Sequence, residues 1–133
     1  TVGIAMGGAG TAVALETGDP LIYQCLDRKA HGTSRAIEGE YRPGERVVLL
    51  DDVITSGGSK LKAAQALLAE GLAVEDVVVL IDREQGGAEE LRRRGYRLHA
   101  ALTLSQVVDT LAEDGLLATA HAQKVRDYLA GGR

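Results

Sequence analysis

The sequence predicts an α/β protein built on a five-stranded, mainly parallel sheet flanked by helices. Short apolar runs, each about the length of a strand, alternate with stretches of helical pattern along most of the chain. Strands separated by helices are typical of a parallel sheet that is covered on both faces. Right-handed crossovers between such strands place ligand-binding residues at the carboxyl ends of the strands.

The individual elements follow from the same pattern. Apolar runs predict strands at residues 2–6, 20–24, 46–50, 77–81 and 97–102. Helical spacing predicts helices at 11–16, from the turn 56–59 to Gly71, at 88–95, near 104–113 and near 118–130. Gly7, Gly8 and Gly10 predict a turn after the first strand. Residues 27–45 hold few apolar side chains, so we expect a long loop there, which in a compact domain is typical of a lid or of disorder.

Length and composition limit the class of protein. We expect one domain over residues 1–133. No apolar run reaches the roughly 18 residues of a membrane span, and the single cysteine, Cys25, fits a reducing compartment, so we expect a cytoplasmic protein. Net charge is -4 and Phe and Trp are absent, which disfavours nucleic-acid binding. Because the chain begins at Thr1 and enters an apolar strand at once, we expect it to start within a fold.

The stretch VVLLDDVITSGGS, residues 47–59, carries the clearest chemical signal. Two adjacent carboxylates, Asp51 and Asp52, follow the predicted strand, and the turn from Thr55 to Ser59 opens a helix. Glycines let successive backbone N–H groups converge on a phosphate, and a helix N-terminus adds partial positive charge. Carboxylates repel phosphate but match the two hydroxyls of a ribose. The motif therefore predicts a sugar at the acids and its phosphate at the turn.

Other motifs fit this stretch less well. A P-loop requires a Lys directly after the last glycine, and here Ser59 follows Gly58. GGAG at 7–10 is a glycine-rich turn and lacks the spacing of the dinucleotide fingerprint. A receiver-type acidic pocket would give the TSGGS turn no role. A purely structural strand-to-helix turn, with Asp as a cap, stays open as the plain alternative.

VVLLDDVITSGGS resembles the phosphoribosyl-pyrophosphate (PRPP) motif of type I phosphoribosyltransferases. Together with VVVLIDREQGG and GYRLHAALTLSQVVDTL, it is similar to orotate phosphoribosyltransferases, especially the domain found in uridine monophosphate synthases. The resemblance spans about residues 2–113 and does not include the family's N-terminal hood. It implies the type I phosphoribosyltransferase fold, which is Rossmann-like.

The resemblance implies transfer of phosphoribosyl from PRPP to orotate, giving orotidine 5′-monophosphate and pyrophosphate in pyrimidine biosynthesis. It implies Mg²⁺ as cofactor, held mainly by PRPP and without direct protein ligands. Its catalytic residues fall on Lys29, His31 and Asp52, and its orotate-binding residues on Thr55 and Arg83. The arginine's planar fork suits the orotate carboxylate. The PRPP-binding residues are Lys29, His31, Asp51, Asp52, Val53, Ile54, Thr55, Ser56, Gly57, Gly58 and Ser59.

In the orotate phosphoribosyltransferases that this sequence resembles, the loop that matches residues 25–40 closes over the neighbouring subunit's site. The resemblance therefore implies a homodimer. Such a loop excludes water where hydrolysis competes with transfer. Cys25 and Leu26 stand where the family has a basic pair, and the Gly-rich turn at 6–10 replaces a loop that carries tyrosine and, in many members, lysine. Two alternatives to orotate transfer therefore stay open: a non-catalytic protein that binds PRPP or a nucleotide, and a phosphoribosyltransferase for another base.

Overall fold

The structure is a computed structural model that describes residues 2–4, 7–24 and 37–131. Its strands form one sheet in the order β3-β2-β1-β4-β5-β6, and all neighbours are parallel except the antiparallel pair β2–β3. The strands are β1 Val2–Ile4, β2 Leu21–Gln24, β3 Ile37–Glu38, β4 Arg46–Ile54, β5 Ala73–Asp82 and β6 Arg97–Thr103. The α/β class and the mainly parallel sheet are as predicted.

The strands differ from the prediction in number and in length. β3, a two-residue strand, lies in the segment that we predicted to be loop throughout. β4 continues to Ile54 instead of ending at Leu50, and β5 begins at Ala73 instead of Val77. Pairing between β4 and β5 runs from Arg46↔Ala73 to Ile54↔Asp82, so backbone hydrogen bonding extends both strands past acidic residues that interrupt their apolar runs.

Five helices lie in the described part of the chain. They are α1 Gly7–Thr17, α2 Gly58–Ala69, α3 Gly87–Arg93, α4 Leu104–Glu113 and α5 Thr119–Gly131. The turn predicted at Gly7, Gly8 and Gly10 is wrong, because α1 begins at Gly7 and contains all three glycines. Glycine is a poor helix former, but its effect is only about 1 kcal/mol per residue, and tertiary contacts override it.

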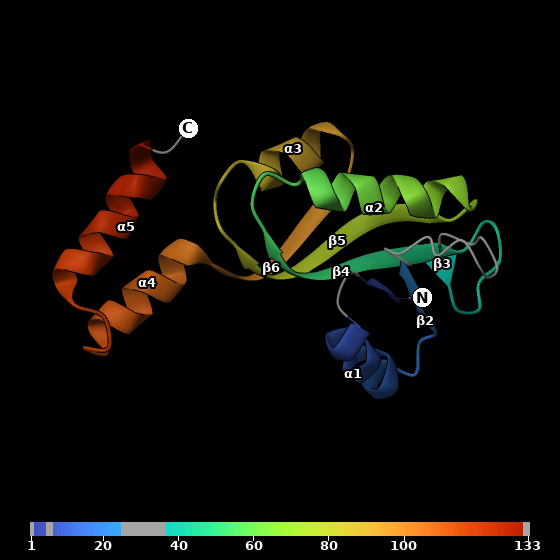
Figure 1. The fold of residues 1–133 in the computed structure, drawn as a ribbon, viewed down its shortest axis with the longest axis horizontal. Coiled ribbons are helices and arrows are strands. Elements are labelled where there is room, and N and C mark those ends of the chain that lie inside the picture. The colour runs from blue at the N-terminus through green and yellow to red at the C-terminus, as the bar shows by residue number, and fades with distance from the viewer. Residues whose placement is uncertain (1, 5–6, 25–36, 132–133) are drawn as a thin grey trace, which may run out of the picture.

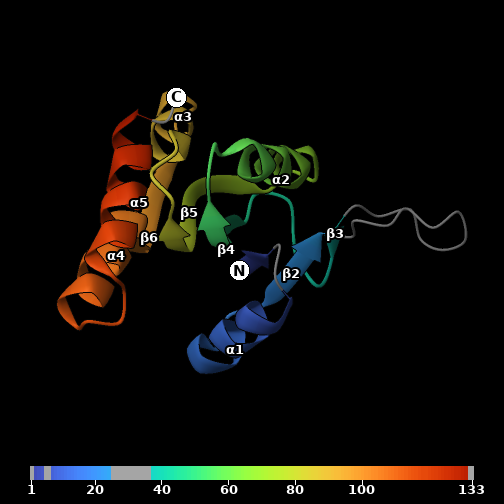
Figure 2. The same ribbon diagram turned by 60° about the vertical axis from the view of Figure 1, so that its left-hand side comes forward.

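The helices form layers around the sheet. α2 and α3 cover one face, α1 lies on the other, and α4 and α5 lie beyond the edge strand β6 (Figures 1 and 2). Leu49 of β4, Val77 and Val79 of β5, Leu67 of α2 and Leu91 of α3 all belong to the core cluster. The central strands and the two helices that cover them therefore pack as two layers around one hydrophobic core.

The second face of the sheet is only partly covered, contrary to the prediction. α1 contacts β1 and β2, which leaves β4 and β5 without a helix on that side among the described residues. Val48 of β4 is 37% exposed and Leu80 of β5 is 56% exposed.

In the part of the chain that the structure describes, no helix has both the length and the apolar character to span a bilayer.

The strand order creates a switch point between β1 and β4. From β1 the chain first adds β2 and β3 on one side, and it then adds β5 and β6 beyond β4 on the other. In open parallel sheets, ligands bind outside the carboxyl ends of the strands at such a point. The end of β4, with the loop that follows it, is therefore the place where a ligand site is expected.

Candidate functional site

Asp51 and Asp52 lie within β4 at this switch point. The predicted boundary was too short, so the acidic pair stands in the last half of the strand and not beyond it. Successive side chains of a strand point to opposite faces. Asp51 shares the face of buried Leu49, under α2, and its side chain is 9% exposed, whereas Asp52 is exposed. The two carboxylates therefore occupy different environments, which the sequence pattern did not reveal.

Asp51 is held by two groups. Its Oδ2 pairs with the ammonium of Lys60 from the first turn of α2, and the side chains are 9% and 8% exposed. Its Oδ1 accepts a hydrogen bond from the backbone N–H of Asp52 at 2.9 Å. Lys60 Nζ also lies 3.3 Å from Ser59 Oγ. Asp51 is thus tied to the start of α2 rather than directed into solvent.

The turn between β4 and α2 leaves helix donors available. Gly57 is the N-cap of α2 in the left-handed conformation, with φ of 84°, and it has no side chain to cap the first turn of this helix. Ser56, Gly58 and Ser59 are exposed, while Thr55 is half-buried. Uncapped N–H groups at a helix N-terminus attract anions. This end of α2 can therefore receive a phosphate, as the motif predicted.

Val53 and Ile54 connect the acidic pair to the turn, and they differ in what they can offer a ligand. Ile54 is fully buried in the core, so it could meet a ligand only through its backbone. Its carbonyl already accepts the N–H of Arg83 at 3.0 Å. Val53 is half-buried on the Asp51 face and pairs with Ile81 of β5.

Arg83 follows β5 and has an exposed side chain. Its sequence neighbours Asp82 and Glu84 could in principle pair with it, but both carboxylates accept backbone N–H groups instead. Asp82 Oδ1 accepts from Glu84 at 2.8 Å, and Glu84 Oε2 accepts from Ser105 at 2.7 Å. No ion pair joins the guanidinium of Arg83 to a carboxylate among the residues described, so it can meet a ligand carboxylate.

The loops after β4 and β5 lie against each other. The φ of Gly57 is +84°, and an added Cβ there would stand 3.3 Å from the carbonyl oxygen of Gly87. Gly87 in turn approaches Ile54 and Thr55 closely. The acidic pair, the anion-binding turn and the Arg83 loop therefore form one edge of the molecule. Lys29 and His31, like Cys25, Leu26 and Met6, lie outside the described residues.

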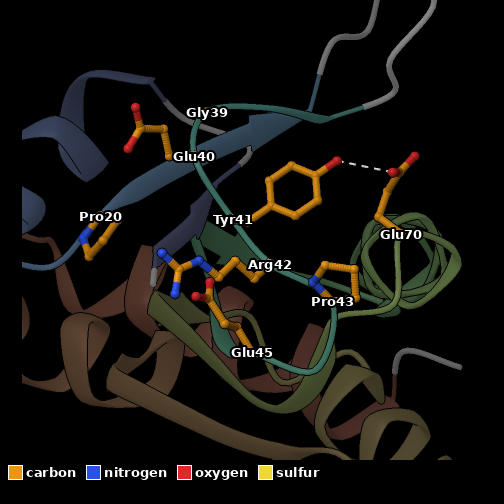
Figure 3. A pocket seen from close by; sticks show the side chains of 8 residues that line it. All are labelled: Pro20, Gly39, Glu40, Tyr41, Arg42, Pro43, Glu45 and Glu70. Carbon is orange, nitrogen blue, oxygen red and sulfur yellow. Dashed lines mark hydrogen bonds between the residues drawn. The ribbon is translucent and has the colours of Figure 1, made fainter.

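A separate hollow lies at the opposite end of the strands. It encloses about 760 Å³ and is lined by residues that precede β2 and β4, together with the end of α2 (Figure 3). Tyr41 donates to Glu70 at 3.0 Å, and Glu40 and Glu45 add further carboxylates. This hollow has room for a small ligand, but the carboxyl ends of the strands and the uncapped helix are stronger evidence for a ligand site.

Sequence reasoning missed two supporting residues. Lys60 lies with Ala64 and Leu67 on the buried stripe of α2, at the i, i+4, i+7 spacing of a helix face, so its burial was visible in the sequence. Glu84 has φ of 58°, the one positive value at a non-glycine residue in the described chain, and no sequence signal indicated it.

Several known proteins are similar to this chain in sequence and in fold. The orotate phosphoribosyltransferase of Saccharolobus solfataricus is 36% identical over 130 residues, which are 96% of this chain and 66% of that protein. The structure of Leishmania donovani UMP synthase has a TM-score of 0.87 at 31% identity, covering 97% of this chain and 28% of that one. Mycobacterium tuberculosis H37Rv orotate phosphoribosyltransferase, solved in complex with PRPP, has a TM-score of 0.64 at 28% identity over 79% of this chain and 63% of that one.

The chain spans between 20% and 66% of the length of the curated relatives it matches. No protein-family model matches it. The sheet, its switch point and its structural neighbours define the α/β fold of the type I phosphoribosyltransferases. Within that class, the chain belongs to the orotate phosphoribosyltransferase family, which includes the corresponding domain of uridine monophosphate synthases.

Proposed function

We propose that this chain forms the core of an enzyme that transfers phosphoribosyl from PRPP to orotate, giving orotidine 5′-monophosphate and pyrophosphate for pyrimidine biosynthesis. The observation that carries the proposal is the edge on which the acidic pair, the uncapped start of α2 and exposed Arg83 lie together, in a chain 36% identical to an orotate phosphoribosyltransferase. Two loops that touch through Gly57 and Gly87 bring a sugar phosphate and a base within reach of each other.

The donor's ribose 5-phosphate end fits the end of β4 and the loop after it. Exposed Asp52 accepts hydrogen bonds from the ribose hydroxyls, and its negative charge stabilises the oxocarbenium-like transition state. The N–H groups at the start of α2, with the hydroxyls of Thr55, Ser56 and Ser59, bind the 5′-phosphate. Val53 and Ile54, which lie between the acidic pair and this turn, are proposed to contact PRPP through their backbone.

Arg83 is proposed to bind the orotate carboxylate. Its guanidinium is exposed, while Asp82 and Glu84 on either side are held by backbone hydrogen bonds. A planar fork matches a carboxylate with two parallel bonds. Thr55, which lies on the loop facing Arg83, would contact the base from the other side. Lys29 and His31 are proposed to meet the pyrophosphate through the loop that carries them.

Mg²⁺ is the proposed cofactor. Phosphate and hydroxyl oxygens of PRPP are the hard ligands that this ion prefers, and it usually keeps few protein ligands. The exposed carboxylate of Asp52 fits a ribose whose hydroxyls also contact the ion. Bound to the donor, Mg²⁺ would neutralise the departing pyrophosphate. Among residues 2–4, 7–24 and 37–131, no group of three or more His, Cys, Asp or Glu forms a metal cluster.

The domain organisation, oligomeric state and cellular compartment of the enzyme are also proposed. We propose that residues 1–133 form one phosphoribosyltransferase core, that two copies of the protein form a homodimer, and that it acts in the cytoplasm. The single cysteine fits a reducing compartment. The family resemblance of the loop at 25–40 supports a neighbouring subunit's contribution to each site.

Orotate consumption tests the function directly. The protein is incubated with PRPP, Mg²⁺ and orotate, and the loss of orotate is followed in the ultraviolet, with PRPP binding measured in parallel by calorimetry. The proposal expects PRPP-dependent loss of orotate and release of pyrophosphate. PRPP binding without turnover would favour a non-catalytic binding protein. Turnover with uracil or a purine base, but not with orotate, would assign the site to another base.

A further inference from the structure

Residues 83–86, the loop between β5 and α3 that carries Arg83, are held by backbone bonds only at their two ends. At the start, the N–H of Arg83 donates to a carbonyl of β4 at 3.0 Å, and at the end the carbonyl of Gly86 accepts from the first turn of α3 at 3.0 Å. Between them the chain has φ of 58° at Glu84 and 87° at Gly86, so it follows neither strand nor helix. The course of this loop therefore depends on contacts from other elements.

Two side chains of the loop reach the two C-terminal helices. Glu84 Oε2 accepts the backbone N–H of Ser105 at the start of α4 at 2.7 Å. Half-buried Gln85 donates from Nε2 to the hydroxyl of Tyr128, in the last half of α5, at 2.9 Å. Each helix thus holds one of two consecutive loop residues, directly after Arg83.

α5 is itself fixed to α4. It packs mainly on that helix, and Arg126 of α5 donates to Asp109 of α4 at 3.0 Å and 2.6 Å. Within the described residues, the bond from Gln85 to Tyr128 is the one hydrogen bond that joins α5 to a part of the fold beyond the two helices and their connection. The loop, α4 and α5 therefore form a closed ring of contacts.

Packing does little to support the loop on the side of α5. A hollow of about 520 Å³ lies there, between loop residues 84–86, the outer face of α3 and the last turn of α5. Close packing is what normally fixes a protein segment in place. Because the hollow leaves the loop without it on this side, the hydrogen bond to Tyr128 is the contact that fixes the loop relative to α5.

We propose that Tyr128 is a positioning residue of the orotate subsite, which holds Gln85 and thereby sets the direction of Arg83. Tyr128 acts through Gln85 and does not touch the base. A guanidinium must face a carboxylate squarely to donate two parallel bonds, so a small displacement of the loop weakens the contact. This inference rests on the proposed function and adds to the subsite a residue from the far C-terminal helix.

Tyr128→Phe removes only the hydroxyl and is the first test. The KM for orotate is expected to rise about three- to tenfold, as for the loss of one hydrogen bond, while kcat and the Kd for PRPP stay within about twofold. Steady-state kinetics and calorimetry measure these values. An unchanged KM for orotate, or an equal rise in the Kd for PRPP, would overturn the proposal.

Tyr41→Phe is the matched control. The hydroxyl of Tyr41 also donates to a side chain, Glu70 at 3.0 Å, but at the opposite end of the strands. Its KM for orotate is expected to stay within about twofold of the unaltered protein. A rise equal to that in Tyr128→Phe would mean that any lost tyrosine hydrogen bond loosens the whole fold, which is contrary to the proposal.

Gln85→Met removes the same hydrogen bond from its other side and keeps the length of the side chain. Its KM for orotate should match that of Tyr128→Phe, and the double variant should match both within about twofold, because one bond is lost in all three. A double variant whose KM is the product of the two separate effects would show that Gln85 and Tyr128 act independently, and the proposal would be wrong.

Backbone hydrogen exchange at residues 83–86, measured without substrates, separates this inference from the proposed function. Exchange is expected to be at least about threefold faster in Tyr128→Phe than in the unaltered protein and in Tyr41→Phe. Equal exchange in all three contradicts the positioning role of Tyr128. Faster exchange in Tyr128→Phe, in a protein that does not consume orotate, contradicts the proposed function alone.

Discussion

The carbonyl oxygen of Thr55 lies 2.3 Å from the point where a Cβ at Gly87 would stand. Atoms of the buried Ile54 side chain lie 2.6 Å and 2.8 Å from the same point. No side chain fits in this space without moving the backbone on one side. The contact joins the loop after β4 to the first residue of α3, and so sets the separation between the proposed phosphate turn and the proposed orotate-binding Arg83.

Gly87→Ala is therefore expected to destabilise the protein by about 2 kcal/mol, since overpacking a tight contact typically costs about 1–3 kcal/mol. Because the two loops must separate, the KM for orotate is expected to rise together with the Kd for PRPP. Chemical denaturation and steady-state kinetics measure the two effects. Gly131→Ala at the end of α5, where an added Cβ meets open space, is the stability control. A stable Gly87→Ala with ordinary kinetics would contradict the role of this contact.

Asp52→Asn tests the exposed carboxylate. Loss of a charge-assisted hydrogen bond of about 1.5–3 kcal/mol corresponds to a Kd for PRPP that is about ten- to a hundredfold weaker. Stability should change little, because the side chain is exposed. Asp19→Asn removes an exposed carboxylate at the other end of the sheet and should leave binding unaltered. If calorimetry gives the same Kd for Asp52→Asn as for the unaltered protein, the ribose does not lie at Asp52.

Arg83→Lys tests the orotate subsite. Lysine keeps the charge but loses the planar fork, so the KM for orotate is expected to rise about tenfold while PRPP binding stays within twofold. Arg83→Gln removes both properties and should have the larger effect. Arg92→Lys on α3, where the guanidinium pairs with Glu89, is the control. A rise in the Kd for PRPP equal to the rise in the KM for orotate would place Arg83 at the donor instead.

The sequence predicted the parts of this site that depend on local pattern. The motif from Asp51 to Ser59 and the position of Arg83 after a strand were visible, because apolar periodicity and glycines report on the backbone directly. The different environments of Asp51 and Asp52 were not, because they arise from the pleat of a strand that is longer than its apolar core. The hydrogen bond from Ser105 to Glu84 joins residues from separate elements, and only the folded chain brings them together.

Glu84 is expected to hold the Arg83 loop. Its φ of 58° is strained for a residue with a Cβ, and its carboxylate accepts the N–H of Ser105 at the start of α4. Glu84→Ala loses this cap and keeps the strain, so a loss of about 1 kcal/mol is expected. Glu84→Gly loses the cap but relieves the strain, and should be more stable than Glu84→Ala by a similar amount.

The KM for orotate of these two variants distinguishes an effect on the position of Arg83 from an effect on the stability of the fold. Both free the loop from α4, so both should raise the KM for orotate, whatever their stability. Denaturation curves and orotate kinetics on the same preparations compare the two effects. If Glu84→Gly has the KM of the unaltered protein, the hydrogen bond to Ser105 does not position Arg83.

Acid stability is expected to depend on Asp76, far from the proposed site. Arg97 donates to both carboxylate oxygens at 2.8 Å, and His99 lies 2.8 Å from one of them. The hydrogen bonds from Arg97 and then from His99 hold the pKa of Asp76 well below its ordinary value of 3.8. A carboxyl whose pKa is lower in the folded state adds stability above its unfolded-state pKa, and this stability is lost as the pH falls toward the folded-state value.

Asp76→Asn should therefore be less stable than the unaltered protein by a constant amount above about pH 5, and the difference should shrink as the pH falls below about 4. Thermal unfolding at a series of pH values measures it. Glu113→Gln on α4, for which no ion pair is found within the described chain, is the control for removing a carboxylate as such. A difference between Asp76→Asn and the unaltered protein that stays constant on acidification would mean that the cluster of Asp76, Arg97 and His99 stabilises the fold by shape and not by charge.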